Sequence, residues 1–290
     1  MNQEATKEYE AGAPFEVQDT SEFQRVLNLP RRDWEEAAKH NDLYQRMTRA
    51  FQMPGGKQAL HLIQASALAD AHDCRGVLAP IRVGEGKTLV TFLLPLVVQG
   101  IKRPMLLIPA ALMDKTWREF KVLQQHWIAH PSYMTRKAFE ESVITYEMLG
   151  RDGGKDRIAS RRPDMLIADE CHKLRNRQAA CTKRVERYMR ANPETVFCGL
   201  SGTITKRSLR DYWHLLYWAL KHKAPIPRTE AEMEKWADAL DEKKVDAIGR
   251  RGPGVLFQLC TDAERQQVAQ AARVAPLGRT QQMPFIQHYE

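Results

Sequence analysis

The sequence lacks three features that would place it in a specialised class of protein. It has only five cysteines, an odd number with no CxxC pair, which disfavours both a disulfide framework and a four-cysteine zinc site. Its longest apolar runs, 89–98 and 105–113, are far shorter than the roughly 20 residues that cross a bilayer. Its first residues contain no apolar segment behind a basic start, so no secretory signal is expected. These absences predict reduced thiols, no membrane partner and a cytoplasmic location.

The composition is that of a globular chain with an excess of positive charge. The 290 residues are 43% hydrophobic and 28% charged, which is enough apolar material to bury a core. The formal net charge is +8, and residues 151–190 alone carry twelve basic and six acidic side chains, a net charge of +6. Such a concentration favours a polyanion as partner, although many proteins are basic for solubility alone.

The hydrophobic pattern divides the chain into four segments. Residues 1–20 are polar and aperiodic, which predicts a mobile tail, and residues 21–56 carry capping signals and helical periodicity. Residues 57–225 alternate short apolar runs with amphipathic stretches, a texture typical of βα units on a parallel sheet. Residues 226–290 are expected to form a helical extension.

The segment 57–225 contains five short apolar runs that predict buried strands of one parallel sheet. In open α/β sheets, ligands collect at the carboxyl ends of the strands, so the turns that follow these runs are where chemistry is expected. The expected strands are 76–80, 105–109, 142–145, 165–168 and 195–200.

A glycine-containing turn follows the first expected strand and precedes an apolar run that predicts a helix. A loop of this kind offers backbone N–H groups to phosphates, with Lys87 reaching the β- and γ-phosphates and Thr88 binding Mg²⁺. Ile81 stands where the usual phosphate-loop pattern begins with glycine, and a bare GKT sequence also occurs by chance in many proteins. The nucleotide-binding candidates are Val83, Gly84, Glu85, Gly86, Lys87 and Thr88.

Two adjacent acids follow the fourth expected strand, 82 positions after Lys87. Asp169 at the strand tip suits a ligand of Mg²⁺, and Glu170 suits a base that orients and deprotonates the attacking water. A strand end with solvated carboxylates is the alternative for this pair taken alone. Its combination with the phosphate loop on the same predicted sheet favours the catalytic interpretation, in which Glu170, Asp169 and Lys87 are the catalytic candidates.

Six segments follow one another along the chain: LHLIQ at 60–64, GEGKT at 84–88, PAAL at 109–112 followed by Trp117 and Phe120, VITYEML at 143–149, DECH at 169–172 with Asn176 beyond it, and LSGT at 200–203. Together they resemble the motifs of the first motor lobe of superfamily-two DEAD/DEAH-type helicases, nearest to the Swi/Snf-like ATPases, and the third resembles that family's DNA-contacting segment. Two positions depart from the family's pattern: Cys171 replaces the usual alanine of the acidic box, and Ile204 stands where Swi/Snf relatives often have proline.

This resemblance implies a RecA-like P-loop NTPase lobe over residues 57–225, a three-layer α/β fold whose parallel sheet is flanked by helices, with helical extensions on both sides. It implies ATP and Mg²⁺ as cofactors and duplex DNA as the track. It also implies that Gln64 reads adenine and that the nucleotide state is coupled to the track by four residues, which are His172, Ser201, Gly202 and Thr203.

The second motor lobe of such enzymes, which supplies an arginine to the γ-phosphate, is not recognisable in this sequence. Arg250 and Arg251 offer guanidinium groups outside any recognisable strand–helix context. Two interpretations therefore stay open: an ATP-dependent translocase or helicase whose second lobe lies in a partner chain or a missing C-terminal half, and a nucleotide- and DNA-binding accessory module that hydrolyses little by itself. A P-loop NTPase unrelated to helicases leaves the segments at 143–149 and 200–203 unexplained.

Overall fold

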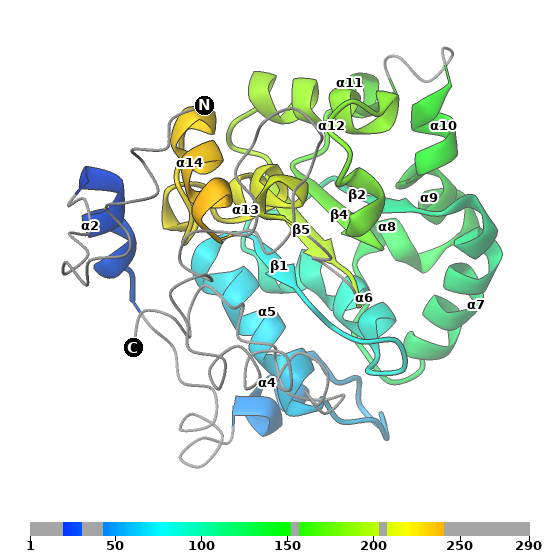
Figure 1. Ribbon diagram of the computed structural model, residues 1–290. Helices are drawn as coiled ribbons and strands as arrows, with labels where there is room; N and C mark the ends of the chain where they lie inside the picture. The colour runs from blue at the N-terminus through cyan, green and yellow to red at the C-terminus, as the bar shows by residue number, and fades with distance from the viewer. Residues whose placement is uncertain (1–19, 31–42, 152–156, 203–207, 241–290) are drawn as a thin grey trace, which may run out of the picture.

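The computed structural model describes residues 20–30, 43–151, 157–202 and 208–240, which form a three-layer α/β structure (Figure 1). Its centre is a parallel sheet with the strand order β1-β5-β4-β2-β3. This is the RecA-like arrangement that the sequence predicted, and each expected strand is present within one residue at either end. The strands are β1 (Val77–Ala79), β2 (Pro104–Ile108), β3 (Val143–Thr145), β4 (Met165–Asp169) and β5 (Val196–Leu200).

Helices cover both faces of the sheet. The first face packs against α4 (Leu43–Phe51), α5 (Leu62–Cys74), α6 (Lys87–Val97), α7 (Met113–Leu123), α8 (Pro131–Met134) and α9 (Arg136–Glu141). The second face packs against α10 (Tyr146–Gly150), α11 (Arg157–Arg161), α12 (Ala180–Ala191), α13 (Trp213–Leu220) and α14 (Glu230–Leu240). Short 3₁₀ turns η1 (Ala110–Leu112), η3 (Cys171–Leu174), η4 (Leu209–Asp211) and η5 (Lys221–Lys223) connect these elements.

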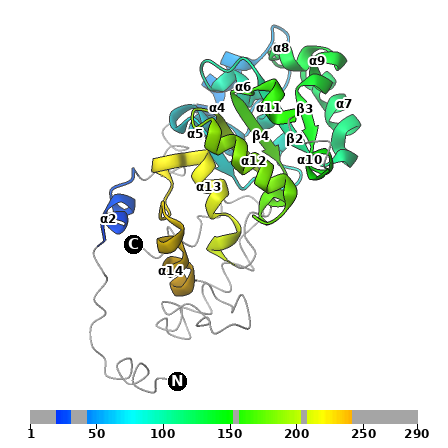
Figure 2. The ribbon, with the colours of Figure 1, turned by 90° about the horizontal axis from the view of Figure 1, so that it is seen from above.

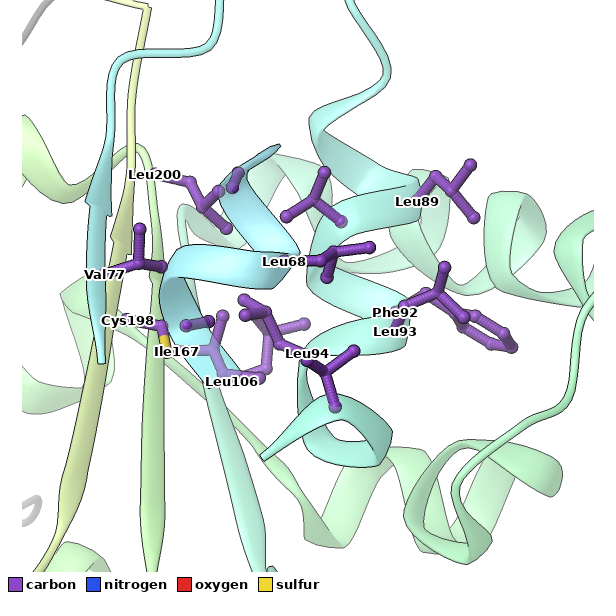
Figure 3. Close-up of a cluster of buried hydrophobic side chains, with 14 of the residues drawn as sticks. Leu68, Val77, Leu89, Phe92, Leu93, Leu94, Leu106, Ile167, Cys198 and Leu200 are labelled. Atoms are coloured by element: carbon purple, nitrogen blue, oxygen red, sulfur yellow. The ribbon is translucent and has the colours of Figure 1, made fainter. Parts of the chain in front are cut away.

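The strands are apolar throughout because both faces of the sheet are covered. Along β2, Leu106 and Ile108 enter the core on the first face, whereas Met105 and Leu107 enter the core on the second face. Successive strand residues point to opposite faces, so a strand buried on both sides needs apolar residues at every position. Figure 3 shows the first of these cores, in which side chains of α5 and α6 meet those of the sheet.

Aromatic rings fill the part of the first core that lies between α6 and α7. The ring of Phe120 packs edge-on against Phe92, with centroids 5.0 Å apart, and lies 4.9 Å from Tyr133. Phe120 is fully buried, and Trp117 packs on Phe139 at 5.3 Å. Phe120 of the predicted DNA-contacting segment is therefore a core residue, and its helical spacing from Trp117 reflects packing.

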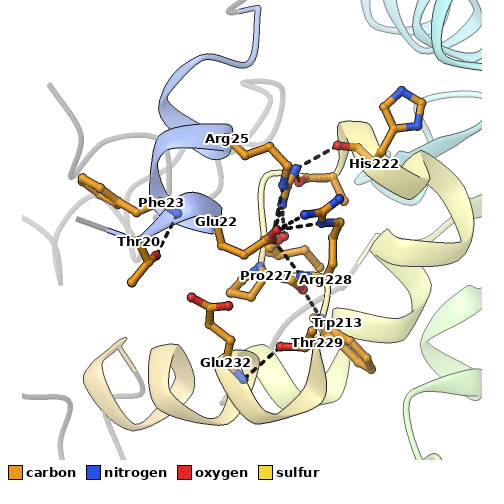
Figure 4. A network of polar contacts seen from close by, with 12 residues as sticks. Thr20, Glu22, Phe23, Arg25, Trp213, His222, Pro227, Arg228, Thr229 and Glu232 are labelled. Atoms are coloured by element: carbon orange, nitrogen blue, oxygen red, sulfur yellow. Dashed lines mark hydrogen bonds and ion pairs between the residues drawn. The ribbon is translucent and has the colours of Figure 1, made fainter. Parts of the chain in front are cut away.

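A polar network joins α2 (Ser21–Leu27) to the segment that follows α13, nearly 200 residues later (Figure 4). Arg25 donates hydrogen bonds to the carbonyl oxygens of His222 and Ala224, at 2.8 and 3.0 Å. The carboxylate of Glu22 accepts from Nε of Arg228 at 2.6 Å. Burial alone would raise the pKa of Glu22, but the hydrogen bonds from Arg228 and Arg25 outweigh it and hold that pKa below its usual value.

Several expectations from the sequence fall wholly or partly outside the described residues. They include the tail, part of the N-terminal helical segment, Cys260, Thr203, Ile204 and the extension beyond residue 240. The four cysteines that are described, Cys74, Cys171, Cys181 and Cys198, form no disulfide. Among the described helices, none combines the length and apolar character that a membrane crossing requires.

Gly76 allows β1 to begin directly against α13. A Cβ atom at this position would lie 2.0 Å from the carbonyl oxygen of Ala219, which is a backbone atom and cannot rotate away. We expect Gly76→Ala to lower the free energy of unfolding by about 3 kcal/mol, because the β1–α13 contact must open. Urea unfolding of the variant beside Gly100→Ala measures this, because Gly100 also has a positive φ but no atom lies within 4 Å of its added methyl; equal losses in both variants would contradict it.

Candidate functional site

Three neighbouring strands bring the predicted site residues to one edge of the sheet. Ala79 at the end of β1 pairs with Leu200 at the end of β5, and Leu200 pairs with Asp169 at the end of β4. The phosphate-loop sequence, the residue Ser201 and the two acids each follow one of these strand ends. The register therefore places them side by side, which sequence spacing alone could not establish.

The loop between β1 and α6 depends on two glycines with positive φ. Gly84 and Gly86 adopt φ values of +94° and +74°, which are accessible to glycine at low cost. Gly86 is the N-cap of α6 and also lies against Gln64, where an added Cβ would approach the amide nitrogen to 2.2 Å. The loop thus delivers Lys87 and Thr88 to the first turn of α6, at the positive end of the helix dipole.

Gln64 lies beneath this loop and is almost completely buried, with 3% of its surface exposed. Its Oε1 accepts from the backbone N–H of His61 at 2.9 Å, and its Nε2 donates to the carbonyl oxygen of Glu85 at 2.9 Å. These contacts support the phosphate loop from below. The adenine-reading role of Gln64 stays a prediction.

The ammonium group of Lys87 contacts the acid expected to activate water. Its Nζ lies 2.7 Å from Oε1 of Glu170, and both side chains are largely shielded, with 10% and 22% of their surfaces exposed. Glu170 adopts a left-handed backbone conformation with φ of 54°, which is uncommon for a residue with a side chain. This turn aims the carboxylate from the end of β4 toward α6 instead of continuing the strand.

Glu170 is also joined to the end of β5, through His172 and through a longer hydrogen bond of 3.5 Å that Oγ of Ser201 donates to its Oε2. Nδ1 of His172 lies 3.0 Å from Oγ of Ser201 and 3.2 Å from Oε2 of Glu170. Burial lowers the pKa of His172, a shift that the nearby Glu170 opposes. The next residue, Gly202, packs against the phosphate loop: a Cβ atom added to it would lie 3.5 Å from backbone atoms of Arg82 and Val83. The structure thus brings together three of the four predicted coupling residues, and Thr203 lies outside the described residues.

Asp169 is held from both sides. Its Oδ1 accepts from the N–H of Glu170 at 3.0 Å, and its carbonyl oxygen accepts from the buried hydroxyl of Tyr146 at 2.7 Å. Burial, followed by the charge of Glu170, raises the pKa of Asp169 to about 6. The sequence singled out the segment that contains Tyr146 but assigned it no role; its reach across β2 to β4 depends on the strand order.

The turn after the two acids is anchored to the second face of the sheet. The carbonyl oxygen of Leu174 accepts from Oγ1 of Thr182 at 3.2 Å and from Nε2 of His214 at 2.8 Å. His214 is buried, which lowers its pKa to about 4, so the ring is neutral at physiological pH. Cys171 is fully buried beside Gly199, a place where the small thiol fits.

One residue at the site was not anticipated from the sequence. The hydroxyl of Thr88 donates to Oε2 of Glu119, on α7, at 2.7 Å. Glu119 lies 31 positions from Thr88, in a stretch of mixed charge, and no local pattern separates it from surface acids such as Glu140. Only the packing of α7 against α6 reveals it.

The donors at this edge suit a phosphate group together with a divalent cation. An ammonium group, a helix N-terminus and backbone N–H groups attract phosphate, while a hydroxyl and a carboxylate are oxygen ligands that Mg²⁺ accepts. No group of three or more metal-ligating side chains occurs within the described residues. Mg²⁺ commonly uses one or two protein ligands and completes its shell with phosphate oxygens and water, so the residues fit MgATP as a joint ligand.

Four exposed basic side chains lie on the polypeptide that follows the acids. Lys173 and Arg175 are exposed in and just after η3, and Lys183 and Arg187 are exposed one helical turn apart on α12. Within the described part of the chain these four side chains form no ion pair. Arg177, by contrast, is held by Glu230 at 2.6 Å.

One model of a known protein family matches more than half of this chain. The model of the DEAD/DEAH box helicase family matches residues 61–212. The SWI2/SNF2 ATPase core of Sulfolobus solfataricus, solved in complex with dsDNA, is similar at 21% identity over 56% of this chain and 36% of that chain, with a TM-score of 0.41. The UvsW helicase of bacteriophage T4 is similar at 16% identity over 61% of each chain, with a TM-score of 0.36. The present chain thus spans less than two thirds of either protein.

Because the pKa of Asp169 is raised, we expect its ionised carboxylate to lower the free energy of unfolding, by an amount that depends on pH. The folded state retains a proton that the unfolded state releases above about pH 4, so stability falls as the pH rises from about 4 to about 6. Asp169→Asn should therefore raise the free energy of unfolding by roughly 1–3 kcal/mol at about pH 8, with a gain that shrinks below about pH 6. Chemical denaturation at several pH values measures it, and a gain independent of pH would contradict the assignment.

Proposed function

The chain belongs to the DEAD/DEAH box helicase family, and we propose that it is the ATP-binding lobe of a superfamily-two translocase or helicase that hydrolyses ATP to move on duplex DNA. Within this proposal, residues 57–225 are the RecA-like motor domain. The flanking segments, 21–56 and 226–290, are extensions of it.

One observation carries the proposal. The carboxyl edge of β1, β5 and β4 gathers a lysine and a hydroxyl at a helix N-terminus, two acids, and a histidine–serine pair. A capped strand end explains any one of these features. It does not explain why Glu170 contacts both Lys87, in the first turn of α6, and His172, which contacts Ser201 after the end of β5.

In the proposed mechanism, Lys87 releases Glu170 and binds the β- and γ-phosphates of ATP, which the loop N–H groups also hold. Thr88 and Asp169 would bind Mg²⁺, whose charge offsets that of the phosphates when it is present. Glu170, no longer neutralised by Lys87, is then available to orient the attacking water and accept its proton. In this mechanism, the ion pair between Lys87 and Glu170 is the form of the site before nucleotide binds, in which the base Glu170 is neutralised.

Coupling to the track is proposed to pass through His172. Its ring lies against Glu170 and Ser201, so a change at the acid when nucleotide binds alters the hydrogen bond to the end of β5. The residues after Ser201 then lead toward α13. Two groups that share one ring nitrogen compete for it, which is a simple physical basis for two states.

The alternative function is a nucleotide- and DNA-binding accessory module with little hydrolysis of its own. A second lobe that donates an arginine to the γ-phosphate is absent from the described residues, and such an arginine accelerates related NTPases by several orders of magnitude. The two functions separate on turnover. A motor lobe should release phosphate once a second lobe, in a partner chain or in a longer form of this protein, is supplied, whereas an accessory module should not.

Substitution of the two paired residues tests the nucleotide site. Lys87→Ala should weaken MgATP binding by at least about tenfold, because it removes the phosphate-binding ammonium group. Glu170→Gln should lose no MgATP affinity but should lose phosphate release, because an amide cannot accept the proton of water. Calorimetric ATP titration and a phosphate-release assay with duplex DNA give the two readouts. Wild-type behaviour of both variants would refute the proposal.

Substitution of the exposed basic residues tests the track. Lys173→Gln and Arg175→Gln should each weaken binding of duplex DNA without sequence preference and lower the slope of log affinity against log salt by about 1. Arg136→Gln is the matched control, because Arg136 lies on α9 and is paired with Asp114 and Glu140. DNA affinities measured at several salt concentrations decide this, and unchanged slopes in both test variants would exclude this surface as the DNA contact.

A further inference from the structure

A role in stabilising the fold does not by itself account for the hydrogen bond between Thr88 and Glu119. The hydroxyl of Thr88 donates to Oε2 of Glu119 at 2.7 Å, across the interface of α6 and α7. Glu119 also lies 3.7 Å from Lys115 one turn earlier, but Lys115 is exposed and Glu119 is only half-buried, and such pairs contribute little to stability. The stronger contact of Glu119 is therefore the one to Thr88, in the first turn of α6 and within the proposed nucleotide site.

The chemistry of a hydroxyl group gives this contact a consequence. A threonine hydroxyl has one hydrogen to donate and two lone pairs with which it accepts. A cation is bound through a lone pair, so the hydrogen must be directed elsewhere, and a carboxylate is a strong acceptor for it. With its hydrogen given to Glu119, Thr88 keeps its lone pairs available.

We propose that Glu119 is a positioning residue that fixes the Thr88 hydroxyl so that its oxygen is presented to the Mg²⁺ of bound MgATP. The proposal rests on the function given above. Glu119 acts through Thr88 and is not itself a metal ligand. The two functional groups of the loop are then each held by a different carboxylate: Lys87 by Glu170, which it leaves when phosphate binds, and Thr88 by Glu119, which it keeps.

The direct test is the Mg²⁺ dependence of nucleotide affinity. The affinity for the fluorescent nucleotide mantADP is measured with Mg²⁺ and with EDTA, and the ratio of the two isolates the metal half of the site. Glu119→Ala should lower this ratio about tenfold and leave the affinity in EDTA unchanged. Alanine is a good helix former, so α7 is retained.

Glu119→Gln separates orientation from charge. Its amide oxygen can still accept from Thr88 although the negative charge is gone, so the ratio should fall by less than about threefold. In the Thr88→Val background, Glu119→Ala should lower the ratio no further, because the hydroxyl that it positions is absent. Two controls should leave the ratio unchanged: Lys115→Met, which removes the other charged partner of Glu119, and Glu140→Ala, which removes an exposed acid of α9.

Each other outcome overturns the proposal in an identifiable way. An unchanged ratio in Glu119→Ala shows that Glu119 has no part in metal binding. Equal losses in the Gln and Ala variants show that charge, and not the hydrogen bond, is what matters. A parallel loss of affinity in EDTA shows a structural role only. If the wild-type protein fails to bind mantADP at all, the proposed function falls, and this inference falls with it.

Discussion

The structure of the site depends on one ion pair, between Lys87 and Glu170. Burial at the tip of a strand removes hydration from Asp169, and the neighbouring charge of Glu170 repels it, which is why the pKa of Asp169 is raised. The ammonium group of Lys87, 2.7 Å from Glu170, offsets part of this cost and joins the phosphate loop to the acids. In the proposed nucleotide site, the carboxylate of Glu170 thus holds the ammonium group that phosphate would bind, and the left-handed turn at Glu170 is the backbone arrangement that permits this contact.

The sheet makes this pair possible. Parallel strands buried on both faces end at a common edge of the sheet. The order β1-β5-β4 therefore places the phosphate loop, Ser201 and the acids at the ends of neighbouring strands. Three buried side chains fix the backbone of the site by hydrogen bonds to its carbonyl oxygens. Gln64 donates to the loop, Tyr146 donates to Asp169, and His214 donates to the turn that follows the acids. A site held by groups that are themselves buried and hydrogen-bonded keeps its geometry, as binding to phosphate and metal requires.

Sequence reasoning reached the strands, the loop and the acids because each has a local signature. An apolar run such as 165–168 predicts a buried strand, and GEGKT predicts a glycine turn before a helix. It did not predict the contact of Glu119 with Thr88 or the hydrogen bond from Tyr146 to the end of β4, because both depend on which elements become neighbours. It also could not show that Phe120 is core, since helical spacing of aromatic residues fits packing and ligand contact equally.

The exchange of Lys87 from carboxylate to phosphate is the central claim, and the MgATP affinity of Glu170→Gln relative to the wild-type protein tests it most directly. In the wild-type protein, phosphate must compete with Glu170 for the lysine, and the substitution removes that competitor together with its repulsion of the triphosphate. The variant should therefore bind MgATP several-fold more tightly in a calorimetric titration. Equal or weaker binding would contradict the claim that the ion pair is the resting form of the nucleotide site.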